Sequence, residues 1–183
     1  MENLKGQISG LKKLLNSIII EVNMKKISKT NAVRILEKEK LEFEVITYNS
    51  KDGKIDGISV AEKIGRSSNE VFKTLVTQGS SREHYVFVIP VEKELDLKKA
   101  AKAAGEKKVE MIHVKDIQKL TGYIRGGCSP VGMKKKFRTF IDISSKELDI
   151  MLVSGGKIGM QIEIGPEDLV NVIDGVQVDL SKD

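Results

Sequence analysis

The chain has 183 residues, of which 40% are hydrophobic and 31% charged, and its formal net charge is +5. That composition is typical of an ordinary soluble globular protein, and the modest positive excess favours either a polyanionic partner or simply a mixed-charge surface. One cysteine excludes an internal disulfide and indicates a reducing compartment, and no apolar run approaches the roughly 20 residues that span a bilayer.

The two histidines, His84 and His113, are far apart in the sequence and have no cysteine or histidine neighbour at the spacing of a zinc site. Neither lies in a recognisable serine-triad motif. We therefore expect no metal and no cofactor.

Residues 1–23 differ from the rest and are predicted to form an N-terminal extension whose order the sequence leaves open. Their apolar segment 14–20 is broken by two polar residues, and no small-residue cleavage site follows, which argues against a signal peptide. Met24 reads as an alternative start, and an appendage that packs on the domain is the competing interpretation. No linker or repeat divides residues 24–183, so we expect a single domain there.

The first predicted helix is capped by Ser28 or Thr30 and is followed by an alternating strand over residues 41–48. A capping box at Ser59 opens a second, short helix, which Gly65 ends.

The strand over residues 71–76 contains the most unusual residue of the chain. Because side chains alternate across a strand, Lys73 shares a face with Val71 and Leu75, whereas Thr74 lies on the other face. Burying an unpaired ammonium group is costly or forces it neutral. Lys73 is therefore either an edge-strand lysine or a lysine at the mouth of a pocket, facing an anionic ligand or a developing oxyanion.

A turn at residues 79–81 and a buried strand over 84–90 come next. Asp96 is then predicted to cap a helix over residues 97–104, and Gly105 to end it.

This helix carries Lys98, Lys99 and Lys102, which form either a solvated basic face or a contact surface for a nucleic-acid backbone. A short strand over residues 109–112 and a short helix that Asp116 caps follow it.

Residues 121–132 contain four glycines, which allow positive φ angles and close approach of the backbone to a ligand. Their N–H groups can hold a carbonyl, carboxylate or phosphate group, and a tight turn is the alternative. The spacing is not that of a Walker A motif, which argues against an ATPase, and Cys128 has no visible base beside it. Four cations cluster after the loop: Lys134, Lys135, Lys136 and Arg138.

Residues 151–164 are predicted to form a hairpin around a glycine turn. Ser154 lies where its first strand meets the turn. Gln161 alternates within the second strand, either exposed on the polar face or pointing inward as a hydrogen-bonding group. A helix that Gly175 ends and a closing strand over residues 176–180 complete the chain.

Together these stretches resemble the YbaK family, the editing domains associated with prolyl-tRNA synthetase. The order and spacing of the motifs carry the resemblance, which spans about residues 25–183. The matching motifs are Val71–Leu75, Leu95–Lys99, Lys107–Met111, Thr121–Tyr123, Gly126–Gly132 and Ser154–Gly159.

The resemblance implies a mixed α+β fold, with a curved, largely antiparallel mixed sheet or barrel surrounded by helices. It implies a cytoplasmic hydrolase of translation that deacylates mischarged aminoacyl-tRNA, above all Cys-tRNA(Pro), alongside prolyl-tRNA synthetase. In this family the thiol of the cysteine substrate is thought to attack the ester itself. The oligomeric state stays open.

By the same resemblance, Lys73 falls on the essential lysine of the family and is expected to position the aminoacyl-adenosine end. Gln161 falls where some members carry Asp, which leaves the amino-acid specificity open. The other expected substrate-binding residues are Tyr48, Thr74, Gly126, Gly127 and Ser154. The expected contacts to tRNA phosphates are Lys98, Lys99, Lys102, Lys134, Lys135, Lys136 and Arg138.

Two rival functions are compatible with the sequence. One is a non-catalytic RNA-binding or synthetase-docking module with a vestigial pocket, and the other is a hydrolase of free esters or thioesters. A third reading keeps the tRNA substrate and changes the amino acid to Ala, Ser or Pro, because Gln161 lacks a carboxylate.

Overall fold

The computed structural model describes residues 29–182, so the expected N-terminal extension over residues 1–23 lies outside it. The helical segments are α2 (Asn31–Lys38), α3 (Gly57–Ile64), α4 (Leu97–Ala104), α5 (Val114–Thr121), the 3-10 turn η1 (Ile143–Glu147) and α6 (Pro166–Ile173). The strands are β1 (Phe43–Thr47), β2 (Phe72–Gly79), β3 (His84–Pro90), β4 (Val109–Met111), β5 (Arg138–Asp142), β6 (Met151–Ser154), β7 (Met160–Ile164) and β8 (Val176–Val178).

Two of the predicted helix caps are confirmed. The Thr30 hydroxyl accepts a hydrogen bond from the N–H of Val33 at the start of α2. The Asp96 carboxylate accepts from the N–H groups of Lys98 and Lys99 at the start of α4, and Gly105 ends that helix with a φ of 76°. Both ends of α4 therefore lie where the sequence placed them, because cap residues satisfy N–H and C=O groups that the helix itself leaves unpaired.

Three helix ends differ from the prediction. Asp56, not Ser59, caps α3, because its carboxylate accepts the N–H of Ser59 and the helix begins earlier. His113 precedes α5, and Asp116 lies within the first turn, where a negative charge stabilises the helix dipole without capping. Asp174, one residue before Gly175, adopts the left-handed conformation that ends α6.

The strands form two sheets. A three-stranded antiparallel sheet has the order β1-β7-β6, and a five-stranded mixed sheet has the order β4-β2-β3-β5-β8, in which β3-β5 and β5-β8 are parallel. Between residues 29 and 182 no closed barrel forms, so the barrel expectation is not confirmed, whereas the mixed α+β class is. β5 and η1 lie over residues 138–147, for which the sequence pattern predicted no element.

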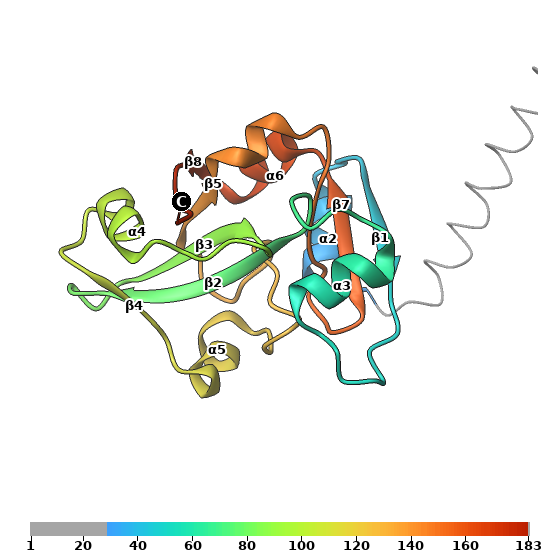
Figure 1. Ribbon diagram of the computed structural model, residues 1–183, viewed down its shortest axis with the longest axis horizontal. Helices are drawn as coiled ribbons and strands as arrows, with labels where there is room; N and C mark the ends of the chain where they lie inside the picture. Colours follow the sequence, from blue (N-terminus) through green and yellow to red (C-terminus); the bar gives the residue numbers. More distant parts are fainter. Residues whose placement is uncertain (1–28, 183) are drawn as a thin grey trace, which may run out of the picture.

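The five-stranded sheet is buried on both faces. Phe72 and Val76 of β2 pack in the main core with α2 and the three-stranded sheet, whereas Phe87 and Ile89 of β3 pack with α4. In Figure 1 the long strands β2 and β3 cross the centre, with α4 and α5 on opposite sides, and the three-stranded sheet with α2 and α3 lies at one end. This packing leaves the N-terminal end of β2 next to α3 and the three-stranded sheet.

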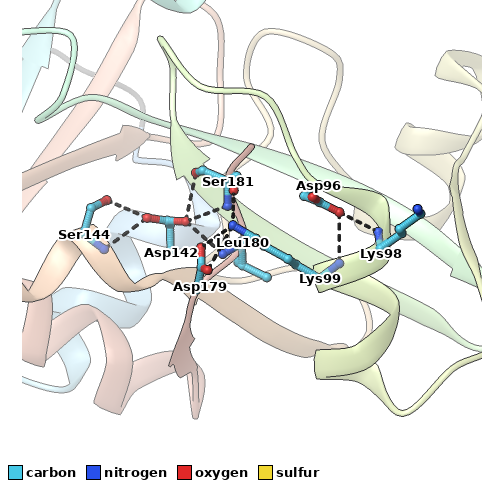
Figure 2. Close-up of polar contacts among 8 residues, drawn as sticks. All are labelled: Asp96, Lys98, Lys99, Asp142, Ser144, Asp179, Leu180 and Ser181. Carbon is cyan, nitrogen blue, oxygen red and sulfur yellow. Dashed lines mark hydrogen bonds and ion pairs between the residues drawn. The ribbon is translucent and has the colours of Figure 1, made fainter. Parts of the chain in front are cut away.

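Asp142 joins the C-terminal segment to the sheet. Its carboxylate, 3% exposed, accepts hydrogen bonds of 2.7 to 3.1 Å from the N–H and hydroxyl groups of Ser144 and Ser181 and from the N–H of Leu180 (Figure 2). Burial raises the pKa of Asp142, but these hydrogen bonds outweigh it and hold the pKa below its usual value. Hydrogen bonds from neighbouring N–H and hydroxyl groups therefore compensate the burial of this carboxylate.

Candidate active site

A cavity of about 110 Å³, termed the first cavity, lies where the two sheets meet α3 and the glycine loop 121–132. It is well below the roughly 300 Å³ at which sites for drug-sized ligands begin, so it suits a group as small as an amino-acid side chain. Its lining includes six residues predicted from the sequence, which come from separate segments of the chain: Tyr48, Lys73, Thr74, Gly126, Ser154 and Gln161.

Four polar atoms in this lining are buried and have no hydrogen-bond partner. They are the hydroxyl oxygens of Tyr48, Thr74 and Ser154 and the amide Oε1 of Gln161. In the part of the chain that the structure describes, these are the buried side-chain polar atoms without a partner, and all of them lie around this one cavity. Buried polar groups are nearly always hydrogen-bonded, so their concentration here indicates a site that a polar ligand completes.

Lys73 is half-buried in the wall of the first cavity. Its ammonium group donates a hydrogen bond of 3.3 Å to the carbonyl of Val91, another cavity residue. Burial lowers the pKa of Lys73, and the nearby charge of Glu94 acts in the opposite direction. The ammonium group therefore has donors to offer a ligand and lies in a partly desolvated position.

The first cavity runs along an open part of the β2 edge. Strand β4 pairs only with residues 77–79 of β2, so at Lys73 the strand has a ladder partner only on the β3 side. Phe72, Lys73 and Thr74 all line the cavity although successive side chains point to opposite faces. β2 is nevertheless an inner strand of the five-stranded sheet, and Val71 is bridged to Leu152 of β6. Lys73 therefore lies in a cavity wall and not on an edge strand.

Ser154 and Gln161 reach the first cavity from the hairpin of β6 and β7. They are directly opposite each other in the antiparallel register, so their positions are coupled. Gln161 is only 5% exposed, so the simplest expectation for it, an exposed polar position, is wrong. The core packs around both faces of β7, and the inward interpretation holds.

The two glycine stretches meet beside the first cavity. Gly126 has a φ of 83° and lines the cavity, and a Cβ there would lie 2.9 Å from Cδ1 of Ile55. Gly127 is not among the lining residues, and a Cβ there would lie 2.8 Å from the backbone of Lys157. Gly127 thus lets the two loops touch, and its expected contact with substrate stays a prediction.

Cys128 forms part of the cavity wall. Burial raises the pKa of its thiol to about 11, while a contact from Sγ to the Thr121 hydroxyl, 4.0 Å away, acts in the opposite direction. A thiol with such a pKa is protonated at neutral pH and is a poor nucleophile. The structure thus agrees with the sequence argument against a catalytic Cys128.

Sequence reasoning missed the apolar wall of the first cavity, which consists of Ile55, Val60, Val71, Phe72 and Val91. Apolar residues at these positions look like ordinary core, and nothing in the sequence separates a cavity wall from a filled interior.

The basic residues proposed for RNA contact differ in their surroundings. Lys99 lies 3.0 Å from the Asp179 carboxylate, Lys136 pairs with Asp174, and Arg138 donates to the carbonyl of Ala104. The exposed remainder are Lys98 and Lys102 on α4 and Lys134 and Lys135 after the glycine loop. Figure 1 places α4 at the opposite end of the sheet from α3. RNA contact by any of these residues stays a prediction.

Residues 29–182 contain no group of three or more His, Cys, Asp or Glu side chains placed to hold a metal ion. Over the same range, no helix combines the length and the apolar character that crossing a membrane requires.

Comparison with known proteins gives consistent findings. A model of the aminoacyl-tRNA editing domain matches residues 57–172. EbsC of Enterococcus faecalis, provisionally assigned as a Cys-tRNA(Pro)/Cys-tRNA(Cys) deacylase, is 47% identical over 147 residues, which cover 80% of this chain and 90% of EbsC. Proline–tRNA ligase of Brachyspira hyodysenteriae is 30% identical over 104 residues, which cover 56% of this chain and 18% of the ligase.

Among solved structures, the fold is similar to that of a protein provisionally assigned as a trans-editing enzyme for prolyl-tRNA synthetase. The TM-score is 0.74 at 20% sequence identity, and the match covers 86% of this chain and 100% of that one. At this identity the likeness concerns the fold alone.

Proposed function

The chain belongs to the aminoacyl-tRNA editing domain family, and from this premise we propose that it hydrolyses the ester bond of a mischarged aminoacyl-tRNA, with Cys-tRNA(Pro) as the main substrate. Residues 24–183 act as one editing domain in this proposal. Its relative EbsC carries the corresponding provisional assignment, at 47% identity.

The observation that carries the proposal is the first cavity with its unpaired polar atoms. An aminoacyl ester brings hydrogen-bond donors on its amino group and acceptors on its ester and ribose oxygens. Gln161 Oε1 can only accept, Lys73 can only donate, and the three hydroxyls can do either. This set of groups complements the two kinds of polar atom at an aminoacylated RNA end.

Lys73 orients the aminoacyl-adenosine end and stabilises the negative charge that develops on the carbonyl oxygen. An aminoacyl ester is already activated, so positioning and electrostatic stabilisation suffice without a protein nucleophile. With a cysteine substrate, its own sulfur bonds to the carbonyl carbon, the ester C–O bond breaks, and the ribose oxygen leaves with the proton of the thiol. Water then opens the cyclic thioester to free cysteine.

The amino acid is selected by the size and polarity of the first cavity. A volume of about 110 Å³ favours small side chains, and Gln161 contributes an uncharged amide to the wall. Alanine and serine esters are therefore the main competing substrates. tRNA identity comes from prolyl-tRNA synthetase as a partner, since contacts to phosphates give affinity without reading sequence.

A deacylation assay on a panel of tRNAs charged with Cys, Ala, Ser or Pro tests the proposal. We expect turnover of Cys-tRNA(Pro) by the wild type and a loss of about 10²-fold or more in Lys73→Ala, as for removal of one oxyanion-stabilising donor. The matched control is Lys38→Ala, at an exposed lysine. Lys63→Ala is unsuitable as a control because the Lys63 ammonium group donates to two backbone carbonyls of the loop before α3. Equal rates for wild type, Lys73→Ala and buffer would refute the enzyme and leave the binding-module reading.

The same assay separates a hydrolase of free esters from a tRNA editing enzyme. The rival predicts that simple cysteine esters are hydrolysed as efficiently as Cys-tRNA(Pro). We expect the tRNA substrate to be preferred, because the basic exposed residues lower its KM through phosphate contacts.

A further inference from the structure

We propose that a second cavity, between α5 and the end of the five-stranded sheet where β2 and β4 pair, binds an unpaired nucleoside of the substrate RNA. This nucleoside lies near the aminoacylated end of the RNA. The proposal rests on the proposed function and adds a binding site to it. The second cavity measures about 430 Å³, within the range of roughly 300 to 1,000 Å³ that small-molecule sites have. It lies between the ends of β2 and β4 and the helix α5.

The lining of the second cavity combines apolar surface, rings and polar groups. Met111, Ile112 and Leu120 are its apolar part, and His84 and His113 contribute imidazole rings. Met111 is 49% exposed although it lies on a sheet strand, so this apolar surface is uncovered. Unpaired bases of RNA are bound by stacking on flat side chains and by hydrogen bonds to their edges.

Positive and negative side chains are equal in number around the second cavity, which disfavours a purely anionic ligand. Lys108 and Lys119 are offset by Glu110 and Asp116, and Lys108 already pairs with Glu110 at 3.0 Å. A bare phosphate would meet these two carboxylates and gain little. Carboxylates accept hydrogen bonds from the amino groups of bases such as cytosine, so a nucleoside fits this set better than an inorganic anion.

The two cavities lie near each other along β2 and α5. The start of β2 lines the first cavity and its end lines the second, and the nearest lining residues, Thr74 and Gln78, are four residues apart, about 13 Å. Helix α5 lines the second cavity as far as Leu120, and the next residue, Thr121, contacts Cys128 in the wall of the first. A ligand that fills both cavities must therefore extend over at least about 13 Å beyond the group held in the first.

tRNA meets this requirement, because the nucleotides that precede its aminoacylated adenosine are unpaired. Exposed cations lie on the two segments that border the cavities: Lys115 and Lys119 on α5, and Lys134 and Lys135 after the glycine loop. The N–H of Lys134 bonds the carbonyl of Thr121 at 2.9 Å, which holds this segment against the end of α5. Positively charged grooves with stacking groups are the usual way to hold single-stranded RNA.

The test compares two substrates on the full chain: cysteinyl-tRNA(Pro), which reaches both cavities, and the cysteinyl ester of adenosine, which reaches only the first. The variant Met111→Ala with His113→Ala removes apolar and ring surface from exposed positions, where folding is little affected. The matched control is Ile150→Ala, at an exposed apolar residue outside both cavities.

We expect kcat/KM for cysteinyl-tRNA(Pro) to fall about 5- to 150-fold in the double variant, the equivalent of about 1 to 3 kcal/mol per stacked base. The adenosine ester is expected to react at an unchanged rate, and Ile150→Ala to match the wild type on both substrates. An unchanged tRNA rate in the double variant, or an equal loss on both substrates, would overturn the second site.

A binding experiment separates this inference from the proposed function. An uncharged RNA oligonucleotide that ends in CCA is titrated into the full chain and followed by NMR shifts of the His84 and His113 ring protons. Shifts that saturate, and that weaken in Met111→Ala, support the site even if no deacylation occurs. Turnover of cysteinyl-tRNA(Pro) without such shifts refutes the site and leaves the enzyme standing. Shifts caused equally by free phosphate would assign the cavity to anions instead.

Discussion

Two buried polar regions of this molecule differ in how far their polar atoms are hydrogen-bonded. Asp142 and Gln161 are almost equally inaccessible, 3% and 5% exposed. The Asp142 carboxylate accepts five hydrogen bonds, whereas Oε1 of Gln161 and the three hydroxyls around it have no partner. Burial alone therefore does not identify a functional group. A buried polar atom that neighbouring donors satisfy stabilises the fold, whereas one without a partner is available to bind a ligand.

The difference also follows from where each group lies in the fold. Asp142 ends β5 beside the last residues of the described chain, so backbone N–H groups surround it (Figure 2). The first cavity lies at a strand edge where β4 no longer pairs with β2. The polar groups there come from separate segments and point into the cavity, so they do not hydrogen-bond to one another.

The largest expected effect on this comparison comes from Asp142→Ala. It leaves the buried N–H group of Leu180 and the partly buried N–H group of Ser181 without an acceptor, at about 1 to 3 kcal/mol each, so we expect a loss of about 3 kcal/mol in unfolding free energy. Denaturant titration measures it, with Asp142→Asn as the milder isosteric control. Deacylation by the folded fraction should persist, and its disappearance would show that the two regions are not independent.

Thr74→Val should act in the opposite direction. Removing an unpaired buried hydroxyl without changing its shape should leave the unfolding free energy unchanged or raise it by about 1 kcal/mol. Turnover of Cys-tRNA(Pro) should drop about tenfold, since about 1.4 kcal/mol of ligand hydrogen bonding is lost. Thr47→Val, at an exposed strand position, is the matched control. A clear loss of stability in Thr74→Val would contradict the idea that this hydroxyl is reserved for a ligand.

Acid should weaken the Asp142 region specifically. The pKa of Asp142 is lowered in the folded chain, so its contribution is complete above the unfolded value of about 3.9 and is lost as the pH falls from there toward the folded pKa. As the pH falls below about 4, the unfolding free energy of the wild type should therefore decrease more than that of Asp142→Asn. Parallel curves for the two proteins would show that the Asp142 carboxylate does not cause the loss of stability in acid.

The smallest effect is expected at Cys128. Because burial raises the pKa of its thiol to about 11, it is protonated under assay conditions, and Cys128→Ala should keep activity within about threefold. Alkylation rates and deacylation of Cys-tRNA(Pro) measure this directly. A decrease as large as that of Lys73→Ala would make the thiol a nucleophile and overturn the present mechanism.

Local signals in the sequence were sufficient for most elements. Runs of β-branched and aromatic residues placed β2 and β3, a glycine turn between two apolar segments placed the hairpin of β6 and β7, and Asp96 with Gly105 fixed both ends of α4. The errors have local causes as well. Asp56 competed with Ser59 as a helix cap, and β5 is too short and too close to charged residues to show a clear alternation.

The sequence by itself determined the order of most elements, the family motifs and the polar residues around the first cavity, because each depends on the nature of a side chain and its immediate neighbours. Only the tertiary structure decided that Oε1 of Gln161 is buried without a partner, that Gly127 allows the two loops to touch, and that the strands form two sheets. These properties depend on atoms brought together from distant segments, and no local pattern reports whether a buried polar group will find a partner there.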